Sequence, residues 1–84
     1  MTKSQERTIH VLLFASLRDQ AGWAEQLLTL PDREVVTAED IWTQLHLGPR
    51  PAAVQIAINQ QLVAPMTSVH SGDEIAFLPP FTGG

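Results

Sequence analysis

The sequence contains no cysteine and only one lysine among its 84 residues. Without cysteine, the chain has no disulfide and no thiolate that could act as a nucleophile or bind a metal. This composition fits a reducing compartment, and we expect the protein in the cytoplasm. A chain of 84 residues indicates a single domain, because chains divide into several domains only at much greater length.

Basic residues are scarce: five lysines and arginines stand against nine aspartates and glutamates, which leaves a net charge of −4. A nucleic-acid-binding protein needs a basic stripe that displaces counterions. The arginines here are scattered along the chain, so we expect no nucleic-acid partner. The apolar runs are far shorter than the ~20 residues that a membrane-spanning helix needs, and the first residues lack the apolar core of a secretion signal. We therefore expect no membrane partner.

Signatures of a self-contained active site are also missing. The sequence has no GxGxxG or GxxxxGK[ST] phosphate loop and no GxSxG nucleophile motif. His10, His46 and His70 lack the spacing of a metal site. The adjacent carboxylates Asp73 and Glu74 would point apart on a strand and make a poor acid–base pair. We expect no bound metal or cofactor, and we expect that the chain alone is not catalytic.

Short apolar segments between turns predict a small α+β fold. Strands are expected at 8–15, 24–30 and 74–78, with a hairpin over 53–65 that turns at Asn59-Gln60-Gln61. Residues 66–74 are expected to form a loop. One substantial helix can cover only one face of a sheet, so the pattern favours an antiparallel or mixed sheet with a single helix layer.

Two helices are expected. A brief one covers 16–22 and is ended by Gly22. The main helix starts at Thr37, buries Ala38, Ile41 and Leu45 on one face, and is stopped by Gly48 and Pro49. Asp40 stands at the capping-box position where Glu or Gln is usual, so an imperfect box is expected.

The face of the sheet away from the helix carries apolar residues where polar ones would be normal. On the first strand, alternation separates Ile9, Val11 and Leu13 from His10, Leu12 and Phe14. Five residues could form one exposed apolar patch: Leu12, Phe14, Leu62, Ala76 and Leu78. Such a patch is typical of a partner-binding surface; the alternative is that a loop covers it.

The chain closes on PPFTGG, directly after an apolar strand. Pro79 and Pro80 favour an extended path, and the six residues reach at most roughly 20 Å. Gly83 and Gly84 have no side chain and could enter a channel too narrow for a Cβ. A terminal carboxylate, with a pKa of about 3.5, is a poor electrophile, so a partner enzyme would have to activate it with ATP. This pattern favours a carrier; the alternative is a chance pair of glycines at a disordered end.

The segments VLLFASLRDQAG and GDEIAFLPPFTGG closely resemble the small subunits of molybdopterin synthase, a family of ubiquitin-like sulfur carriers. AINQQLV resembles the same family and also the sulfur carrier of thiamin thiazole synthesis. The likeness spans residues 9 to 84, although 23–53 match only in element order. It implies a β-grasp fold with a mixed sheet and one main helix packed across one face, in a single domain of residues 1–84 with 79–84 as an extended, flexible tail.

The resemblance also implies a reaction. An enzyme similar to ubiquitin-activating enzymes would use ATP to adenylate Gly84, and a sulfur donor protein would convert the adenylate into a thiocarboxylate. The tail would enter the large synthase subunit, within a heterotetramer. Sulfur would then pass to cyclic pyranopterin monophosphate and form the molybdopterin dithiolene.

By position, the resemblance implies that Gly84 is the reactive terminus and that Gly83 is the slim residue behind it. Apolar partner contacts are implied for Phe14, Leu62 and Leu78, and a polar contact near the tail for Arg18. The remaining implied partner-binding residues are those of the tail: Pro79, Pro80, Phe81 and Thr82. Some relatives have Phe in place of Leu78 and a smaller aliphatic in place of Phe81, differences that could change which partner fits.

Two alternatives to a pterin carrier stay open. The first is a sulfur carrier for thiamin thiazole synthesis, tRNA thiolation or protein modification. The second is a non-catalytic ubiquitin-like binding module that uses its apolar patch and never its terminus. The diproline of FLPPFTGG favours the pterin pathway over the thiamin pathway.

Overall fold

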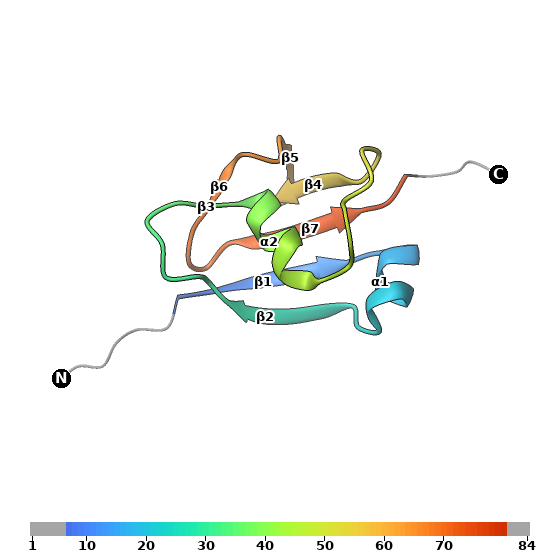
Figure 1. Cartoon of the computed structure of the whole chain (residues 1–84), viewed down its shortest axis with the longest axis horizontal. Helices are drawn as coiled ribbons and strands as arrows, with labels where there is room; N and C mark the ends of the chain where they lie inside the picture. The colour runs from blue at the N-terminus through green and yellow to red at the C-terminus, as the bar shows by residue number, and fades with distance from the viewer. Residues whose placement is uncertain (1–6, 81–84) are drawn as a thin grey trace.

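The computed structural model describes residues 7–80 (Figure 1). The elements in chain order are β1 (Thr8–Leu13), α1 (Ala15–Ala21), β2 (Glu25–Thr29), β3 (Val36–Thr37), α2 (Ala38–Leu45), β4 (Gln55–Ile58), β5 (Gln61–Val63), β6 (Ser68–Val69) and β7 (Glu74–Leu78). Five strands form the main sheet in the order β2-β1-β7-β4-β5, and β3 pairs with β6 in a separate two-stranded sheet.

The main sheet is mixed. At its centre β1 runs parallel to β7, whereas the other neighbours, β1–β2, β4–β7 and β4–β5, are antiparallel. The helix α2 lies across one face of this sheet (Figure 1). The expected mixed sheet with one main helix layer is thereby confirmed. Within residues 7–80, neither helix is long and apolar enough to cross a membrane.

The core lies between α2 and the sheet. From β1, Ile9, Val11 and Leu13 are buried, as the alternation predicted, and from β7 Ile75 and Phe77 are fully buried. The helix contributes Ala38, Ile41 and Trp42 from its inner face. Burying one such large side chain stabilises the fold by about 1.5–3 kcal/mol relative to leaving it exposed.

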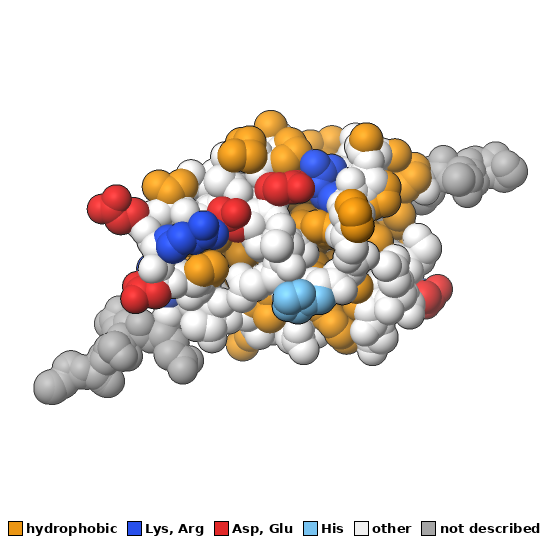
Figure 2. Space-filling view, viewed as in Figure 1, with side chains coloured by type: hydrophobic (Ala, Val, Ile, Leu, Met, Phe, Trp, Pro, Cys, Tyr) orange, Lys and Arg blue, Asp and Glu red, His pale blue; other side chains and the backbone are white. Residues whose placement is uncertain are grey.

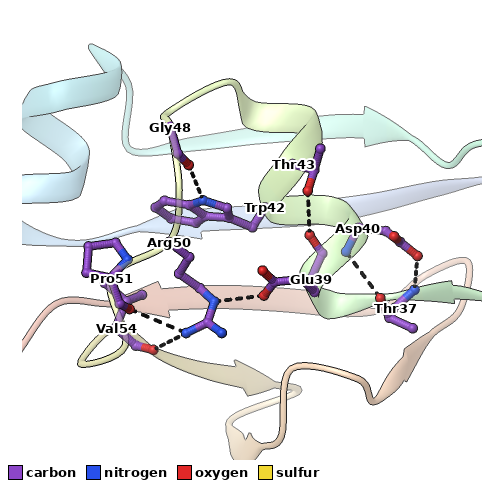
Figure 3. A network of polar contacts seen from close by, with 9 residues as sticks. All are labelled: Thr37, Glu39, Asp40, Trp42, Thr43, Gly48, Arg50, Pro51 and Val54. Atoms are coloured by element: carbon purple, nitrogen blue, oxygen red, sulfur yellow. Dashed lines mark hydrogen bonds and ion pairs between the residues drawn. The ribbon is translucent and has the colours of Figure 1, made fainter.

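The N-terminus of α2 carries a complete capping box, so the expectation of an imperfect one is wrong. The Thr37 hydroxyl accepts a hydrogen bond from the Asp40 backbone N–H at 3.2 Å, and the Asp40 carboxylate accepts one from the Thr37 backbone N–H at 2.9 Å (Figure 3). The aspartate side chain is therefore long enough for the role usually filled by glutamate. This backbone hydrogen bond, helped by the Arg33 guanidinium at 3.2 Å, lowers the pKa of Asp40 despite partial burial.

The end of α2 differs from the expectation. The helix stops at Leu45, and His46 takes a left-handed conformation with φ of 58°, before Gly48 and Pro49 are reached. The His46 backbone N–H donates to the Thr43 carbonyl at 3.3 Å, and the Trp42 indole Nε1–H donates to the Gly48 carbonyl at 2.7 Å (Figure 3), so the chain after α2 is held against the helix. Histidine tolerates the left-handed region better than most residues.

Arg50 fastens the segment between α2 and β4. Its Nε donates to the Glu39 carboxylate at 2.8 Å, and its Nη1 donates to the carbonyl oxygens of Val54 at 3.1 Å and Pro51 at 3.4 Å (Figure 3). The side chain is only 14% exposed. A single guanidinium therefore joins the first turn of α2 to the start of β4.

Two short strands were not anticipated. Val36–Thr37 forms β3, and Ser68–Val69, predicted as loop, forms β6. The two strands pair with each other although they lie far apart in sequence. Each has only two residues, which is too few to display a strand periodicity. In the β4–β5 hairpin, Gln61 already belongs to β5, which leaves a two-residue turn. The remaining strands and the brief α1, closed by Gly22 at φ of 87°, confirm the expectations, except that β1 ends at Leu13 and Ala15, expected in that strand, begins α1.

Candidate functional site

The candidate site lies on the sheet face opposite α2, which we call the open face. Strand register places Leu12 beside Ala76, Ala76 beside Ala57, and Ala57 beside Leu62. One row of apolar side chains thus crosses β1, β7, β4 and β5. Phe14, just beyond β1, completes this set with Leu78 of β7. Segments from opposite ends of the chain therefore build one surface.

A groove of about 370 Å³ runs over this surface. Its apolar lining comprises Leu12, Phe14, Ala57, Leu62, Ala76 and Leu78. Phe14 is 43% and Leu62 63% exposed, so none of the segments within residues 7–80 covers the groove. The expected apolar patch is confirmed, and the alternative of a covering loop is wrong for the described chain.

The groove is hollow because small residues form its floor. Ala57 and Ala76 are direct neighbours on adjacent strands, between the larger side chains of Phe14, Leu62 and Leu78. Ala57 was missed by the sequence reasoning, although its position between the inward-facing Ile56 and Ile58 carries the alternation that would have placed it on this face.

A second apolar cleft adjoins the groove at the end of β7. It measures about 250 Å³ and is lined by Phe14, Ala15, Leu78, Pro79 and Pro80. Because Phe14 and Leu78 border both hollows, apolar surface continues from the sheet to the first residues of the tail. The other expected tail residues, Phe81, Thr82, Gly83 and Gly84, lie outside the described residues.

Acidic side chains border the groove. His10 Nε2 lies 2.9 Å from the Glu25 carboxylate, and Glu74 stands beside His10 in the strand register and forms part of the groove lining. Glu25 itself stands beside Leu12, and the exposed Leu27 stands beside His10. A partner that covers the groove and this border needs an apolar centre and a basic edge.

Arg18 lies apart from the groove lining, on α1. Its guanidinium is 3.7 Å from the carboxylate of Asp19, and its side chain is 55% exposed. Within residues 7–80 the Arg18 side chain pairs with Asp19 and with no residue near the tail, so the polar contact near the tail expected for Arg18 stays a prediction. Among residues 7–80, no three His, Asp or Glu side chains are grouped as metal ligands.

The other face of the molecule differs from the open face. Figure 2 looks onto the α2 side, where acidic and basic side chains are interspersed over the left and middle of the view, while hydrophobic ones gather toward the upper right. Mixed charges of this kind are typical of a solvated outer surface. We therefore assign the candidate site to the open face.

The sequence of the chain is similar to those of known proteins. The model of the ThiS family matches residues 11–84. The chain is 36% identical to the molybdopterin synthase sulfur carrier subunit of Chlamydomonas reinhardtii, over 90% of this chain and 98% of that protein. It is also 36% identical to the subunit of the same name from Haemophilus influenzae, over 90% and 99% of the two chains.

The fold has close counterparts among solved structures. The crystal structure of SAMP1 from Haloferax volcanii, a small archaeal modifier protein, aligns with a TM-score of 0.73 over 92% of this chain and 99% of that chain. The two sequences are 22% identical, so this likeness concerns the fold alone. It confirms the expected ubiquitin-like β-grasp.

Proposed function

The chain belongs to the ThiS family, and from that premise we propose that it is the sulfur carrier subunit of a molybdopterin synthase. Two relatives of that name are 36% identical to it over nearly their whole length. The observation that carries the proposal is the continuous apolar surface from the open-face groove to Pro79 and Pro80. A carrier needs such a surface, because its partner must hold the domain while receiving the tail.

In this proposal the reacting group is the carboxylate of Gly84. An activating enzyme adenylates it with ATP and releases pyrophosphate, and sulfide-level sulfur from a sulfur donor protein then displaces AMP to leave a thiocarboxylate. The thiocarboxylate sulfur is a softer and better nucleophile than a carboxylate oxygen. It attacks an electrophilic carbon of cyclic pyranopterin monophosphate, and an oxygen substituent leaves that carbon as the C–S bond forms. Water then cleaves the resulting thioester, which restores the carboxylate and leaves the sulfur on the pterin. Two carriers in turn supply the two sulfurs of the dithiolene.

The domain itself provides docking and reach. Phe14, Leu62 and Leu78 contact the large subunit, with which the carrier forms a heterotetramer. Residues 79–84 act as an extended, flexible tail on a single domain, and Gly83 lets it pass a narrow channel. The further contacts are proposed for Arg18, Pro79, Pro80, Phe81 and Thr82. The carrier holds no cofactor of its own, since ATP is a substrate of the activating enzyme, and it works in the cytoplasm.

Intact-mass spectrometry tests the proposal. The purified chain is incubated with ATP, the activating enzyme of the same cell and a sulfur source. We expect one sulfur-for-oxygen exchange at the C-terminus, and no exchange in a variant that lacks Gly84. A wild-type mass that stays unchanged with every candidate activating enzyme would instead support a non-catalytic binding module.

A carrier for another pathway is the second candidate, because the matching family model is that of ThiS. Thiamin thiazole synthesis, tRNA thiolation and protein modification would use the same thiocarboxylate with a different acceptor. Purification of the native protein with its bound partners distinguishes a molybdopterin carrier from a carrier for another pathway. Recovery of the molybdopterin synthase large subunit supports our proposal, and recovery of a thiazole synthase or a tRNA thiolase supports the alternative.

A further inference from the structure

The β4–β5 hairpin turns through Asn59 and Gln60 alone, since Ile58 pairs directly with Gln61. Both turn residues have positive φ, 50° for Asn59 and 72° for Gln60. Two-residue hairpin turns of this kind favour Asn followed by Gly. Asparagine tolerates the left-handed region, whereas glutamine has a Cβ and no local hydrogen bond that would favour it there. Gln60 is therefore held in a strained conformation.

The turn is fixed from one side by the start of β7. The Asn59 backbone N–H donates to the Glu74 carbonyl at 2.7 Å, and the Glu74 N–H donates to the Asn59 side-chain oxygen at 3.0 Å. The Asn59 side-chain amide also donates to the Asp73 carboxylate at 3.0 Å, which in turn accepts from the His70 N–H at 2.8 Å. These contacts hold Asn59 and leave Gln60 little choice of conformation.

Gln60 lies at the border of the open-face groove, where it forms part of the lining with Leu62 and Glu74. It is exposed, and its side-chain amide makes no hydrogen bond with another residue of the range 7–80. The strain is thus not offset by a contact of that side chain within the described domain. Strained residues that the surrounding structure over-determines cluster at functional sites.

We propose that Gln60 is a partner-recognition residue, whose amide pairs with a main-chain peptide group of the molybdopterin synthase large subunit. This inference rests on the proposed function. An apolar segment that fills the groove brings its own peptide groups to the polar edge, where they must find partners. A side-chain amide supplies both a donor and an acceptor, and the fixed turn presents it at the groove without further ordering of the backbone.

Two substitutions separate the strain from the contact. Gln60→Gly removes both, and should raise Tm by about 2–4 °C because relief of the left-handed strain exceeds the extra freedom of glycine in the unfolded chain. Gln60→Ala removes the amide and keeps the strain, so Tm should stay close to that of the wild type. Both variants should bind the purified large subunit about three- to tenfold more weakly in calorimetric titrations.

Gln61→Ala is the matched control. Gln61 is the next residue, is also exposed, and faces the other side of the sheet by alternation from Leu62. Its replacement should leave affinity for the large subunit unchanged within about twofold. A loss of affinity equal to that of Gln60→Ala would show that any change in this hairpin weakens binding, and it would overturn a specific role for Gln60.

The remaining outcomes are also decisive. If the wild type binds the large subunit and both Gln60 variants bind equally well, the inference falls while the proposed function stands. If Gln60→Gly fails to raise Tm, the strain on which the inference depends is absent. If the wild type does not bind the large subunit at all, the proposed function fails and the inference fails with it.

Discussion

The indole ring of Trp42 and the phenyl ring of Phe77 meet edge to face in the interior, with ring centroids 5.2 Å apart and an interplanar angle of 66°. Trp42 belongs to α2 and Phe77 to β7, so the contact joins the main helix to the strand that leads into the tail. The next residue of β7, Leu78, lines the groove on the opposite face. One strand thus holds the core with one set of side chains and lines the open-face groove with the other.

This division of β7 predicts opposite effects for neighbouring substitutions. Phe77→Ala should lower the free energy of unfolding by about 3–5 kcal/mol, because it empties a fully buried site. Leu78→Ala should lower it by about 1 kcal/mol or less and instead weaken binding to the large subunit. Denaturant titrations of both variants check the first claim. Equal losses of stability would mean that β7 has no face reserved for docking.

The capping box predicts a pH dependence. The folded-state pKa of Asp40 lies below its ordinary value of 3.8, so the unfolded chain binds the proton more tightly. The stabilisation from this carboxylate is therefore fully present above pH 3.8 and is lost as pH falls through the lower, folded-state pKa. Asp40→Asn should reduce stability at pH 7 by about 1 kcal/mol.

Unfolding free energies measured from pH 7 down to pH 2 check this behaviour. The difference between wild type and Asp40→Asn should shrink as the pH drops below 3.8. A difference that stays constant over the whole range would show that the negative charge of Asp40 does not stabilise the folded state.

Comparison of Arg50, which is mostly buried, with Arg18, which is exposed, tests how much a buried guanidinium stabilises the fold. Arg50→Ala should cost about 1–3 kcal/mol of unfolding free energy, because it removes three hydrogen bonds from a side chain that is 14% exposed. Within residues 7–80, Arg18→Ala removes only an exposed pair at 3.7 Å and should cost about 0.5 kcal/mol or less. Thermal unfolding of both variants decides the point, and similar losses would contradict the anchoring role of Arg50.

The groove predicts where a charge disrupts docking. Leu62→Glu should weaken binding to the large subunit about tenfold or more, because the glutamate would lose its hydration in an apolar interface. Val35→Glu is the control, since Val35 is 60% exposed and precedes β3, outside the main sheet and its open face. Its affinity should match that of the wild type. Titration calorimetry with the large subunit measures both, and equal weakening would mean that docking does not depend on the groove.

Much of the fold follows from local patterns in the sequence. The alternation in β1 and β7 separated buried from open-face residues correctly, and Gly22 marked the end of α1. The helix end was misplaced because the glycine at position 48 is a strong stop signal, whereas the chain already turns at His46 and is held there in part by the indole hydrogen bond from Trp42 to Gly48. That bond depends on tertiary packing, which no local pattern records.

The sequence predicted most residues of the candidate site, but it did not predict the groove that they form. Leu12, Phe14, Ala76 and Leu78 followed from alternation, Leu62 was placed with them, and Ala57 was missed. The groove between them depends on the sheet order, which places β1 and β4 on either side of β7. The strain at Gln60 was hidden because the position of a two-residue turn, and so the sign of φ, is set by the register of β4 with β5.

The central claim concerns the last carbonyl of the chain, and one measurement reaches it directly. Carrier with a single additional residue after Gly84 is put through the same activation and sulfuration as the wild type, and both are mixed with the large subunit and cyclic pyranopterin monophosphate. The wild type should yield the dithiolene, and the extended chain, confirmed intact by mass at the end of the reaction, should yield none. Equal yields from the two proteins would contradict the account.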